Sequence, residues 1–504
     1  MRPREDTAAV EFRATAAGDG TGAADALAPA TAPMTAPMTA PMTAPMTAPM
    51  TWGQAEIWKP IKWYGDQSSY FNIKLAFDLP QDPAPAGLAA LLRVLRYLVE
   101  RHQALRSHYF DGPDGPCQRV LWDGIFTVAL RESGPGAARE AAEALAAELG
   151  AACFDHTAEW PVRFGVVSRD GRPTHLAIAI AHIAVDATAM RMLYLELMEL
   201  LRAPDDPRLP ARTSREPLEQ AAFEQSPQGR RRSRKALTYW RSKLERIPAT
   251  MFDYEAAEPE PLRFHKVHLE SPALALAADR LADACQTSVS NALLTATALV
   301  LGAISGRTTA ALQLIAANRL DEERARMVAA AAQNGLFVLD FAGATVAGAI
   351  RAGHRASLAG YFYAHVDPAQ LDEITARIEA ARGEKLDLTA YFNDTRGDQD
   401  RWEKIHGAQV PEAQARQLLE ETIVVHDAAF PVQDCKFFMV VDPADDRCVI
   451  SLLADTAYLP LPTVEKALRG IETILLEAAY RDVPVSEIPE LTGLHPPRRA
   501  SAES

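Results

Sequence analysis

An apolar run that ends in a histidine constrains the fold of this chain more than any other feature. The stretch THLAIAIA, residues 174–181, predicts a strand that is mostly buried, because nearly all its side chains are small or branched and apolar. His182 follows at once, and Asp186 then precedes ATAMRMLYLELMELL, a pattern typical of a helix with an aspartate cap. The histidine is therefore expected on a short turn between a buried strand and a helix.

Strand and helix patterns are mixed along the chain from residue 52 onward. The predicted strands are 70–79, 161–168, 174–181, 310–317, 335–341, 388–394, 435–442 and 447–455. The predicted helices are 87–105, 137–150, 187–202, 229–246, 273–287, 290–305, 345–360, 370–382 and 463–480. This mixture favours an α/β fold built of two-layer lobes over a bundle or a barrel. Because 504 residues exceed one compact core, we expect two lobes.

The expected organisation has four parts. Residues 1–51 are of low complexity and end in five tandem copies of TAPM, whose regular prolines prevent a helix, so disorder is predicted. Each copy also contains a methionine at which translation can start. Whether this segment is disordered or is not translated, we expect it to lie outside the fold. We expect an N-terminal lobe over 52–250, a C-terminal lobe over 251–492 and a flexible tail over 493–504.

The charge and the cysteine content restrict which partners the protein can bind and in which cellular compartment we expect it. A net charge of −14 argues against binding of nucleic acid or of an anionic membrane, because their phosphates would be repelled. The basic run RRRSRK, residues 230–235, keeps two interpretations: a solvated helix face, or a docking patch for an acidic partner protein. The five cysteines lack metal-ligand spacing, and no stretch is apolar over a membrane span, so we expect a cytoplasmic protein without a metal.

His182 and Asp186 admit two interpretations. On a turn before a helix, a neutral imidazole can take a proton from a nucleophile, and the backbone N–H of Ala187 can bind a developing oxyanion. Alternatively, His182 is an ordinary core histidine and Asp186 is only a helix cap. The His-x-x-x-Asp spacing does not separate the two, since it arises easily by chance in a chain with 12 histidines.

Further motifs make the chain similar to the condensation domains of nonribosomal peptide synthetases. The matching segments are TWGQAEIW with YFNIKLAFDL, LVERHQALRSHYF (98–110) for R-H-E-x-L-R-T-x-F, IAHIAVDA for H-H-x-x-x-D-G, LTYWRSKLERIP, the apolar segment 290–319, NGLFVLDF (334–341), YFNDTR (391–396) and VSEIPEL (485–491). They occur in the family's order over residues 52–491.

The resemblance implies two lobes of the chloramphenicol acetyltransferase type, which form a V with a central channel. It implies an acyltransferase of natural-product biosynthesis that makes an amide or an ester, with His182 as the catalytic base, beside the N–H of Ala187 that we expect as oxyanion donor. Because the sequence contains no recognisable adenylation or carrier segment, we expect a free-standing enzyme. Asp186, paired with Arg319, and also Arg106 would support the site structurally. The donor would be a phosphopantetheine thioester on an acyl or peptidyl carrier protein in trans, or else coenzyme A, and the acceptor a small molecule or a peptide. No bound cofactor is implied.

The sequence departs from the family's pattern close to the catalytic motif. Ala181 stands for the first histidine, Ala187 for the glycine and Ala189 for the serine that follows. Elsewhere, Gln103 replaces a glutamate and Leu339 an asparagine. The methyl group of Ala187 narrows the space in which the thioester must lie. These alanines motivate a contrasting hypothesis, a non-catalytic protein that binds carrier proteins or a peptide and positions them.

Overall fold

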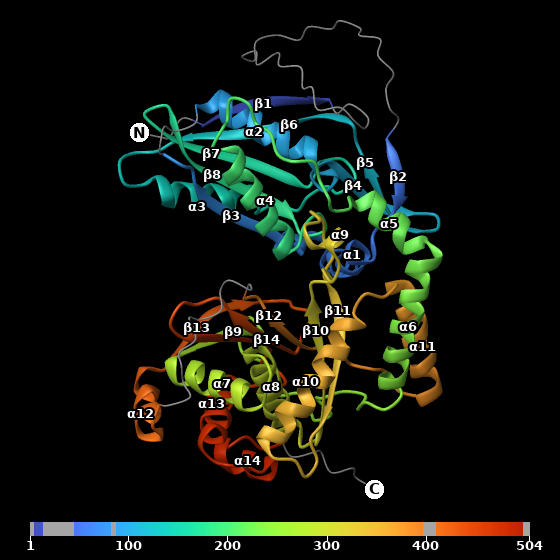
Figure 1. Ribbon diagram of the computed structural model, residues 1–504, viewed down its shortest axis with the longest axis vertical. Coiled ribbons are helices and arrows are strands. Elements are labelled where there is room, and N and C mark those ends of the chain that lie inside the picture. Colours follow the sequence, from blue (N-terminus) through green and yellow to red (C-terminus); the bar gives the residue numbers. More distant parts are fainter. Residues whose placement is uncertain (1–4, 14–44, 82–86, 397–409, 497–504) are drawn as a thin grey trace, which may run out of the picture. The chain divides into compact units, whose positions relative to one another are not determined.

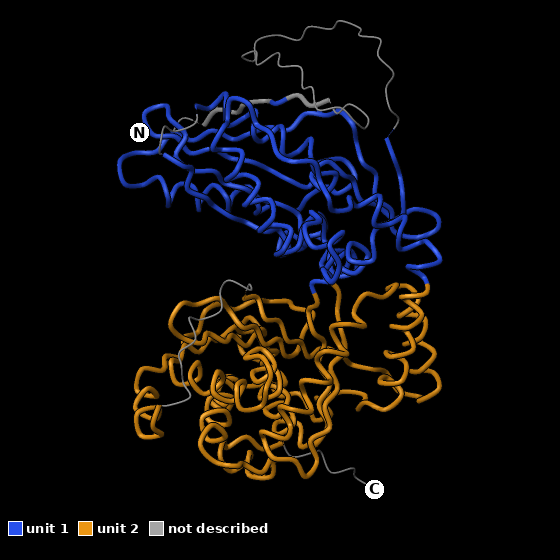
Figure 2. Tube along the Cα trace, viewed as in Figure 1, with its two compact units in different colours: residues 1–230, 317–332 blue, residues 231–316, 333–504 orange. Residues whose placement is uncertain are grey.

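The computed structural model describes residues 5–13, 45–81, 87–396 and 410–496. The chain has a mixed α/β fold (Figure 1) and divides into two compact units (Figure 2). Unit 1 comprises Met1–Arg230 and Ala317–Ala332, and unit 2 comprises Arg231–Ala316 and Gln333–Ser504. This division differs from a single boundary near residue 250 in two ways. The helix that carries the basic run packs on unit 2, and the segment 317–332 returns to unit 1.

The main sheet of unit 1 has five strands. In spatial order they are β1 (Glu5–Arg13), β6 (Asp123–Glu132), β7 (Val162–Arg169), β8 (Arg172–Ala181) and β3 (Asn72–Asp78). The helices α2 (Leu88–Arg101) and α4 (Ala187–Leu200) pack on one face, and α3 (Ala138–Leu149) packs on the other. The second half of β8 is therefore buried on both faces, which explains why its sequence is continuously apolar rather than alternating.

A smaller sheet completes unit 1. Its strands are β2 (Met46–Pro49), β5 (Gly115–Val120) and β4 (Ser107–Gly112), and the helical segments nearby are α1 (Trp52–Tyr64), η1 (Gly65–Phe71), η2 (Gln103–Arg106) and α5 (Pro217–Gln225). Helix α1 begins with a capping box, in which the side chains of Thr51 and Gln54 each accept a hydrogen bond from the other's backbone N–H. The N–H of Trp52 donates to the buried carboxylate of Glu224 at 2.8 Å.

Three parts of the segments expected to be disordered or flexible are ordered. Strand β1 pairs along its whole length with β6, and β2 pairs with β5. Each lies at the edge of its sheet, where pairing needs backbone groups more than an apolar pattern, and Val10 of β1 is buried in the core. In the tail, Leu494 is buried in the core of unit 2. The TAPM repeats from residue 31 to 44, and residues 497–504, lie outside the described residues.

Unit 2 is built on a mixed seven-stranded sheet. In spatial order its strands are β11 (Gln333–Asp340), β10 (Thr309–Ala316), β12 (Ala390–Asp394), β14 (Phe437–Asp442), β15 (Cys448–Asp455), β9 (Phe264–Ser271) and β13 (Ile423–Phe430). Its helical elements are α6 (Pro227–Leu244), α7 (Pro272–Ala284), α8 (Val289–Ser305), α10 (Val346–Phe362), α11 (Pro368–Arg382), α12 (Glu412–Gln417), η4 (Leu418–Glu421), α13 (Leu461–Tyr480), η5 (Val485–Glu487) and α14 (Ile488–Thr492). Helix α6 starts at the last residues of unit 1.

The two faces of this sheet are covered by different helices. Helices α7, α8, α10 and α13 bury one face in the large core of unit 2, to which β10 contributes Leu312 and Leu314. Ala311 of β10 and Leu336 of β11 point to the other face and pack against Trp240 of α6 and its neighbours. Among the described helices none is by itself long and apolar enough to cross a membrane. The bent pair α7 and α8 passes such a test together, and both of its helices are largely buried.

The connection between β10 and β11 belongs to unit 1. It covers residues 317–332 and contains the short helix α9 (Glu322–Ala325). The N–H of Arg215 donates to the carbonyl of Glu323 at 2.8 Å, and the side chains of these two residues form an ion pair. Val328 joins the apolar core of unit 1. This segment, hereafter the 317–332 loop, brings residues of the second half of the sequence to the turn after β8.

Candidate active site

The turn after β8 holds His182 in a defined orientation. Strand β8 ends at Ala181, the turn covers residues 182–184, and α4 begins at Ala187. The half-buried imidazole makes a 2.8 Å hydrogen bond between its Nδ1 and the carbonyl oxygen of Val185. A carbonyl only accepts, so Nδ1 carries the proton and the lone pair of the neutral ring lies on Nε2. Within the described ranges no hydrogen bond to Nε2 is present, which leaves this atom available to accept a proton.

The carboxylate of Asp186 is buried and fully occupied. Its Oδ1 accepts from the N–H of Ala189 at 2.8 Å and from Nη2 of Arg319 at 2.7 Å. Its Oδ2 accepts from the N–H groups of Ala331 at 2.9 Å and Ala332 at 3.2 Å. Asp186 therefore caps α4 and anchors the 317–332 loop, and none of these bonds is to the neighbouring imidazole. These bonds are those of an aspartate that holds the start of α4 and the loop in position.

Arg319 is the centre of the loop's hydrogen bonds. Besides the ion pair with Asp186, its guanidinium donates to the carbonyls of Arg324 at 2.9 Å, Met327 at 2.7 Å and Ala329 at 3.1 Å. The side chain is only 7% exposed. A buried charge that is paired and surrounded by acceptors holds its neighbours in one geometry, since moving any of them leaves the charge without compensation. Arg319 thus fixes the loop around one carboxylate.

The loop also lies directly against the start of α1. A Cβ placed on Gly53 would come within 2.5 Å of the carbonyl oxygen of Ala330 and 2.7 Å of the Cα of Ala331. Only a glycine permits such a close approach of two backbones. Ala331 is also one of the residues that donate to Asp186. The start of α1, the loop and the turn that bears His182 are therefore joined by a continuous series of contacts.

The alanines of the catalytic motif lie in two different environments. Ala181 and Ala189 are almost completely buried in the core of unit 1. Ala187 is exposed and is the first residue of α4, where backbone N–H groups have no partner within the helix. No acceptor for the N–H of Ala187 occurs in the part of the chain that the structure describes. An oxyanion-binding role for this N–H stays a prediction.

Arg106 is placed in a different local network. Its Nη1 donates to the carbonyl oxygen of Leu121 at 2.6 Å, and its guanidinium lies 4.9 Å from the ring centre of Trp122. Burial lowers the pKa of Arg106 to about 10, and Glu216 acts in the opposite direction. The bond to Leu121 holds the connection between β5 and β6, and Nη2 of Arg106 also donates to the carbonyl oxygen of Glu100 on α2 at 3.5 Å. A supporting role of Arg106 toward His182 stays a prediction.

A second buried histidine links three elements of unit 1. The Nε2 of His102, at the end of α2, lies 2.7 Å from Oε2 of Glu196 on α4, and its Nδ1 lies 3.9 Å from Oε1 of Glu216. Burial alone would lower the pKa of His102, but the hydrogen bond to Glu196 and the nearby carboxylate of Glu216 outweigh it and raise the pKa. Sequence analysis does not identify this cluster, because His102 is 94 residues from Glu196 and no spacing motif connects the three residues.

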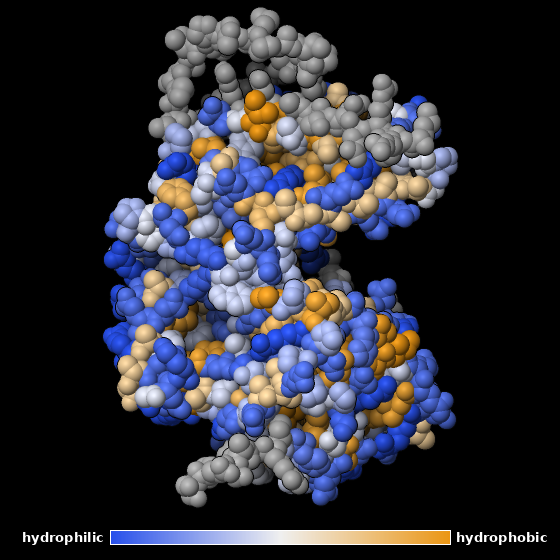
Figure 3. Space-filling view, turned by 180° about the vertical axis from the view of Figure 1, so that it is seen from behind, coloured by the Kyte–Doolittle hydropathy of each residue, from blue (hydrophilic) through white to orange (hydrophobic). Residues whose placement is uncertain are grey.

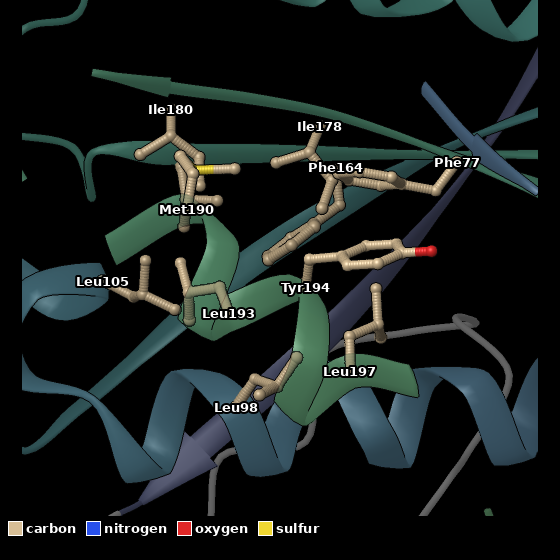
Figure 4. A pocket seen from close by; sticks show the side chains of 11 residues that line it. Phe77, Leu98, Leu105, Phe164, Ile178, Ile180, Met190, Leu193, Tyr194 and Leu197 are labelled. Atoms are coloured by element: carbon tan, nitrogen blue, oxygen red, sulfur yellow. The ribbon is translucent and has the colours of Figure 1, made fainter. Parts of the chain in front are cut away.

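An apolar pocket lies between α4 and the sheet (Figure 4). Its lining side chains are Phe77, Leu98, Leu105, Val162, Phe164, Ile178, Ile180, Met190, Leu193, Tyr194 and Leu197. The ring of Tyr194 packs on Phe77 with 5.0 Å between centroids, and its hydroxyl points away from the other labelled side chains in Figure 4. The pocket encloses about 20 Å³, room for one water-sized group. As it stands, it is a packing gap rather than a site for a long acyl chain.

The described part of the chain contains no group of three or more His, Cys, Asp or Glu residues that is arranged to hold a metal ion. All five cysteines are described, and none forms a disulfide. The groups present at the turn after β8 include one imidazole nitrogen, a helix N-terminus and the buried ion pair of Asp186 and Arg319.

Comparison with known proteins identifies one family. Residues 46–338 match the family described as "Condensation domain". No curated protein sequence matches the chain significantly.

Solved structures of similar fold include three from natural-product synthases. The condensation domain of the Monacolin K polyketide synthase MokA is 13% identical, with 88% of this chain and 100% of that chain covered and a TM-score of 0.67. The X-domain from teicoplanin biosynthesis, in complex with OxyB, is 18% identical, with coverages of 90% and 98% and a TM-score of 0.64. The condensation domain that mediates chain release from the enacyloxin polyketide synthase is 21% identical, with coverages of 88% and 85% and a TM-score of 0.59. At these identities the likeness shows a common fold.

Proposed function

Because this chain belongs to the condensation domain family, we propose that it is a free-standing acyltransferase that forms an amide or an ester from a thioester donor. The observation that carries the proposal is the orientation of His182, whose Nδ1 is bonded to the carbonyl of Val185 and whose Nε2 is left without a partner among the described residues. A base of this kind needs an accessible lone pair, and this arrangement supplies one at a half-buried position.

His182 acts as the general base in this proposal. The nitrogen or oxygen of the acceptor attacks the thioester carbon while its proton passes to Nε2 of His182. The C–S bond then breaks, the new C–N or C–O bond remains, and the departing thiolate takes up the proton. The N–H of Ala187 binds the oxyanion of the tetrahedral intermediate, an assignment supported by its place at the exposed first residue of α4. Asp186 and Arg319 keep the turn in position.

The donor in this proposal is an acyl group on the phosphopantetheine arm of a carrier protein that is supplied in trans. The acceptor is a small molecule or a peptide. Support comes from the family and from a structural relative whose condensation domain releases a chain from a polyketide synthase. Coenzyme A is the alternative carrier of the same thioester, and the two differ in whether a protein surface takes part in recognition.

The test uses thiol release. Wild-type protein is mixed with panels of acyl-carrier, acyl-coenzyme A and acyl-N-acetylcysteamine thioesters, together with amine and alcohol acceptors, and the product is identified by mass spectrometry. We expect acceptor-dependent release that falls by about 10² to 10⁴ in His182→Ala, the usual contribution of a general base. Tyr194→Phe, an exposed change on the same helix, serves as control. Unchanged turnover in the folded His182→Ala protein would contradict the proposal.

The second candidate function is a non-catalytic protein that binds carrier proteins or a peptide. The alanines at positions 181, 187 and 189 favour it, and the structurally similar X-domain was solved in a complex with another protein, OxyB. Under this alternative no thioester turns over, whereas carrier protein or peptide binds equally to wild type and His182→Ala. Binding by isothermal titration calorimetry together with the thiol-release assay separates the two functions.

A further inference from the structure

Helix α6 carries a group of four exposed cations on one face. Arg230, Arg231, Arg234 and Lys235, hereafter the basic strip, are all exposed. Among the described residues none of these four forms an ion pair, although ion pairs are frequent elsewhere on this acidic protein. Figure 3 shows one face of the molecule, on which hydrophilic and hydrophobic residues are interspersed.

The opposite face of the helix explains why the basic strip is held in place. Trp240 is almost fully buried and its Nε1 donates to the carbonyl of Tyr363 at 3.2 Å, and the N–H of Asp367 donates to Ser233 Oγ at 3.1 Å. Ala236 and Leu237 pack on the same side. Because the apolar face is fixed on unit 2, the helix cannot rotate to bring its cations toward carboxylates, and the strip remains directed to solvent.

This arrangement lowers the stability of the helix. Like charges three or four residues apart repel, and the strip contains three such pairs: 230 with 234, 231 with 234, and 231 with 235. The positive end of the helix dipole also disfavours cations near the N-terminus, and the first turn of α6 contains no acidic residue to offset this. Packing does not require these four cations, and binding of an external anion would offset their mutual repulsion.

We propose that the basic strip is the docking surface for a carboxylate-rich helix of the carrier protein that delivers the thioester. This inference rests on the proposed function for the identity of the partner. Residues 230–235 span about 8 Å along the helix axis, a length matched by carboxylates placed three or four residues apart on a partner helix. An extended polyanion such as RNA or an anionic membrane reaches beyond the strip and meets a protein of net charge −14, which disfavours both.

The test compares two matched double variants of unit 2. Arg231→Glu with Arg234→Glu alters the basic strip, and Lys466→Glu with Arg469→Glu alters two exposed cations at the same spacing on α13. We expect the first variant to raise KM for an acyl-carrier donor about tenfold at 50 mM NaCl, with kcat unchanged. KM for the acyl-N-acetylcysteamine donor stays at the wild-type value in both variants. Equal KM values of the two variants for the carrier donor would overturn the proposal.

If wild type turns over neither donor, that result contradicts the proposed function but does not test the docking proposal. A binding measurement then tests whether the basic strip is a docking surface. The probe is each holo carrier protein of the source organism, fluorescently labelled, with anisotropy recorded at 50 and 500 mM NaCl. Salt-sensitive binding that is lost only in the strip variant supports docking. Binding that is unaffected by the strip variant, or strip-dependent binding of a 20-nucleotide RNA or of phosphatidylglycerol vesicles in place of every carrier protein, overturns it.

Discussion

Arg319 and Asp186 form an ion pair at 2.7 Å across 133 residues of sequence. The pair is almost completely buried, and the same carboxylate also caps α4 and receives two backbone N–H groups of the 317–332 loop. One interaction thereby sets the position of the helix start, the loop and the turn that carries His182.

Arg319→Met leaves the carboxylate of Asp186 buried without its counter-charge. We expect the free energy of unfolding to fall by about 3 to 5 kcal/mol, with a partial recovery in the double variant Asp186→Asn with Arg319→Met, because that variant removes both charges. Urea denaturation of the three proteins measures this. Arg93→Met, which breaks a largely exposed pair with Asp205, should cost less than about 1 kcal/mol. A similar loss in Arg93→Met and Arg319→Met would contradict the prediction.

The hydrogen bond from Nδ1 of His182 to Val185 predicts the tautomer of the ring. At pH 8 a neutral His182 should carry its proton on Nδ1, because the carbonyl oxygen can accept but not donate. Nitrogen-15 NMR of histidine-labelled protein distinguishes the two tautomers, and the spectrum of His182→Ala identifies the signal. Observation of a protonated Nε2 would mean that this nitrogen cannot serve as the base.

His156 predicts a loss of stability in acid. Burial lowers its pKa from 6.5 to about 4, against opposing effects of Glu159 and Asp155. As the pH falls below 6.5, the unfolded chain binds a proton that the folded protein does not bind until about pH 4. The histidine therefore reduces stability progressively over this window, by roughly 3 kcal/mol in total.

His156→Phe removes this acid sensitivity while keeping an aromatic ring near Trp58, whose centroid lies 5.5 Å away. Urea denaturation at pH 7 and at pH 4.5 should show a smaller difference for the variant than for wild type. Parallel pH dependences of the two proteins would show that His156 titrates alike in the folded and unfolded states.

In Gly53→Ala, a gain in helix propensity is opposed by a steric clash of the added Cβ atom. Alanine is favoured over glycine inside a helix by about 1 kcal/mol, yet a Cβ at this position meets backbone atoms of Ala330 and Ala331 within 3 Å. Because backbone atoms cannot move aside as a flexible side chain does, we expect the variant to be less stable by about 1 to 3 kcal/mol.

Gly348→Ala in α10 is the matched control, since its Cβ would meet only Thr345 Oγ1 at 3.4 Å. This variant should be more stable than wild type, in line with propensity alone. Thermal melting compares the two variants. A gain in stability for Gly53→Ala similar to that for Gly348→Ala would mean that the loop does not press on the start of α1.

The sequence alone is sufficient to predict a helix or a strand where the pattern of its residues is local and its apolar side chains are buried. The strand over 174–181, the helix that follows and its cap at Asp186 are present as predicted, because a strand buried on both faces and an amphipathic helix carry their own periodicity. Seven other predicted strands are present as well, from β3 to β15. Strands such as β9 and β13 are absent from the prediction because polar residues interrupt their apolar pattern, and β13 lies at a sheet edge.

The histidine and the aspartate follow from the sequence, but the relation of each to its partners comes from the tertiary structure. The family resemblance assigns Arg319 to Asp186, whereas the bond from Nδ1 to Val185, the two backbone donors of the loop and the contact at Gly53 have no sequence pattern. The exposure of the basic strip is likewise set by the burial of Trp240 on the other side of α6. Periodicity reports which side chains are buried within one element, and only the packing of distant elements determines which atoms they meet.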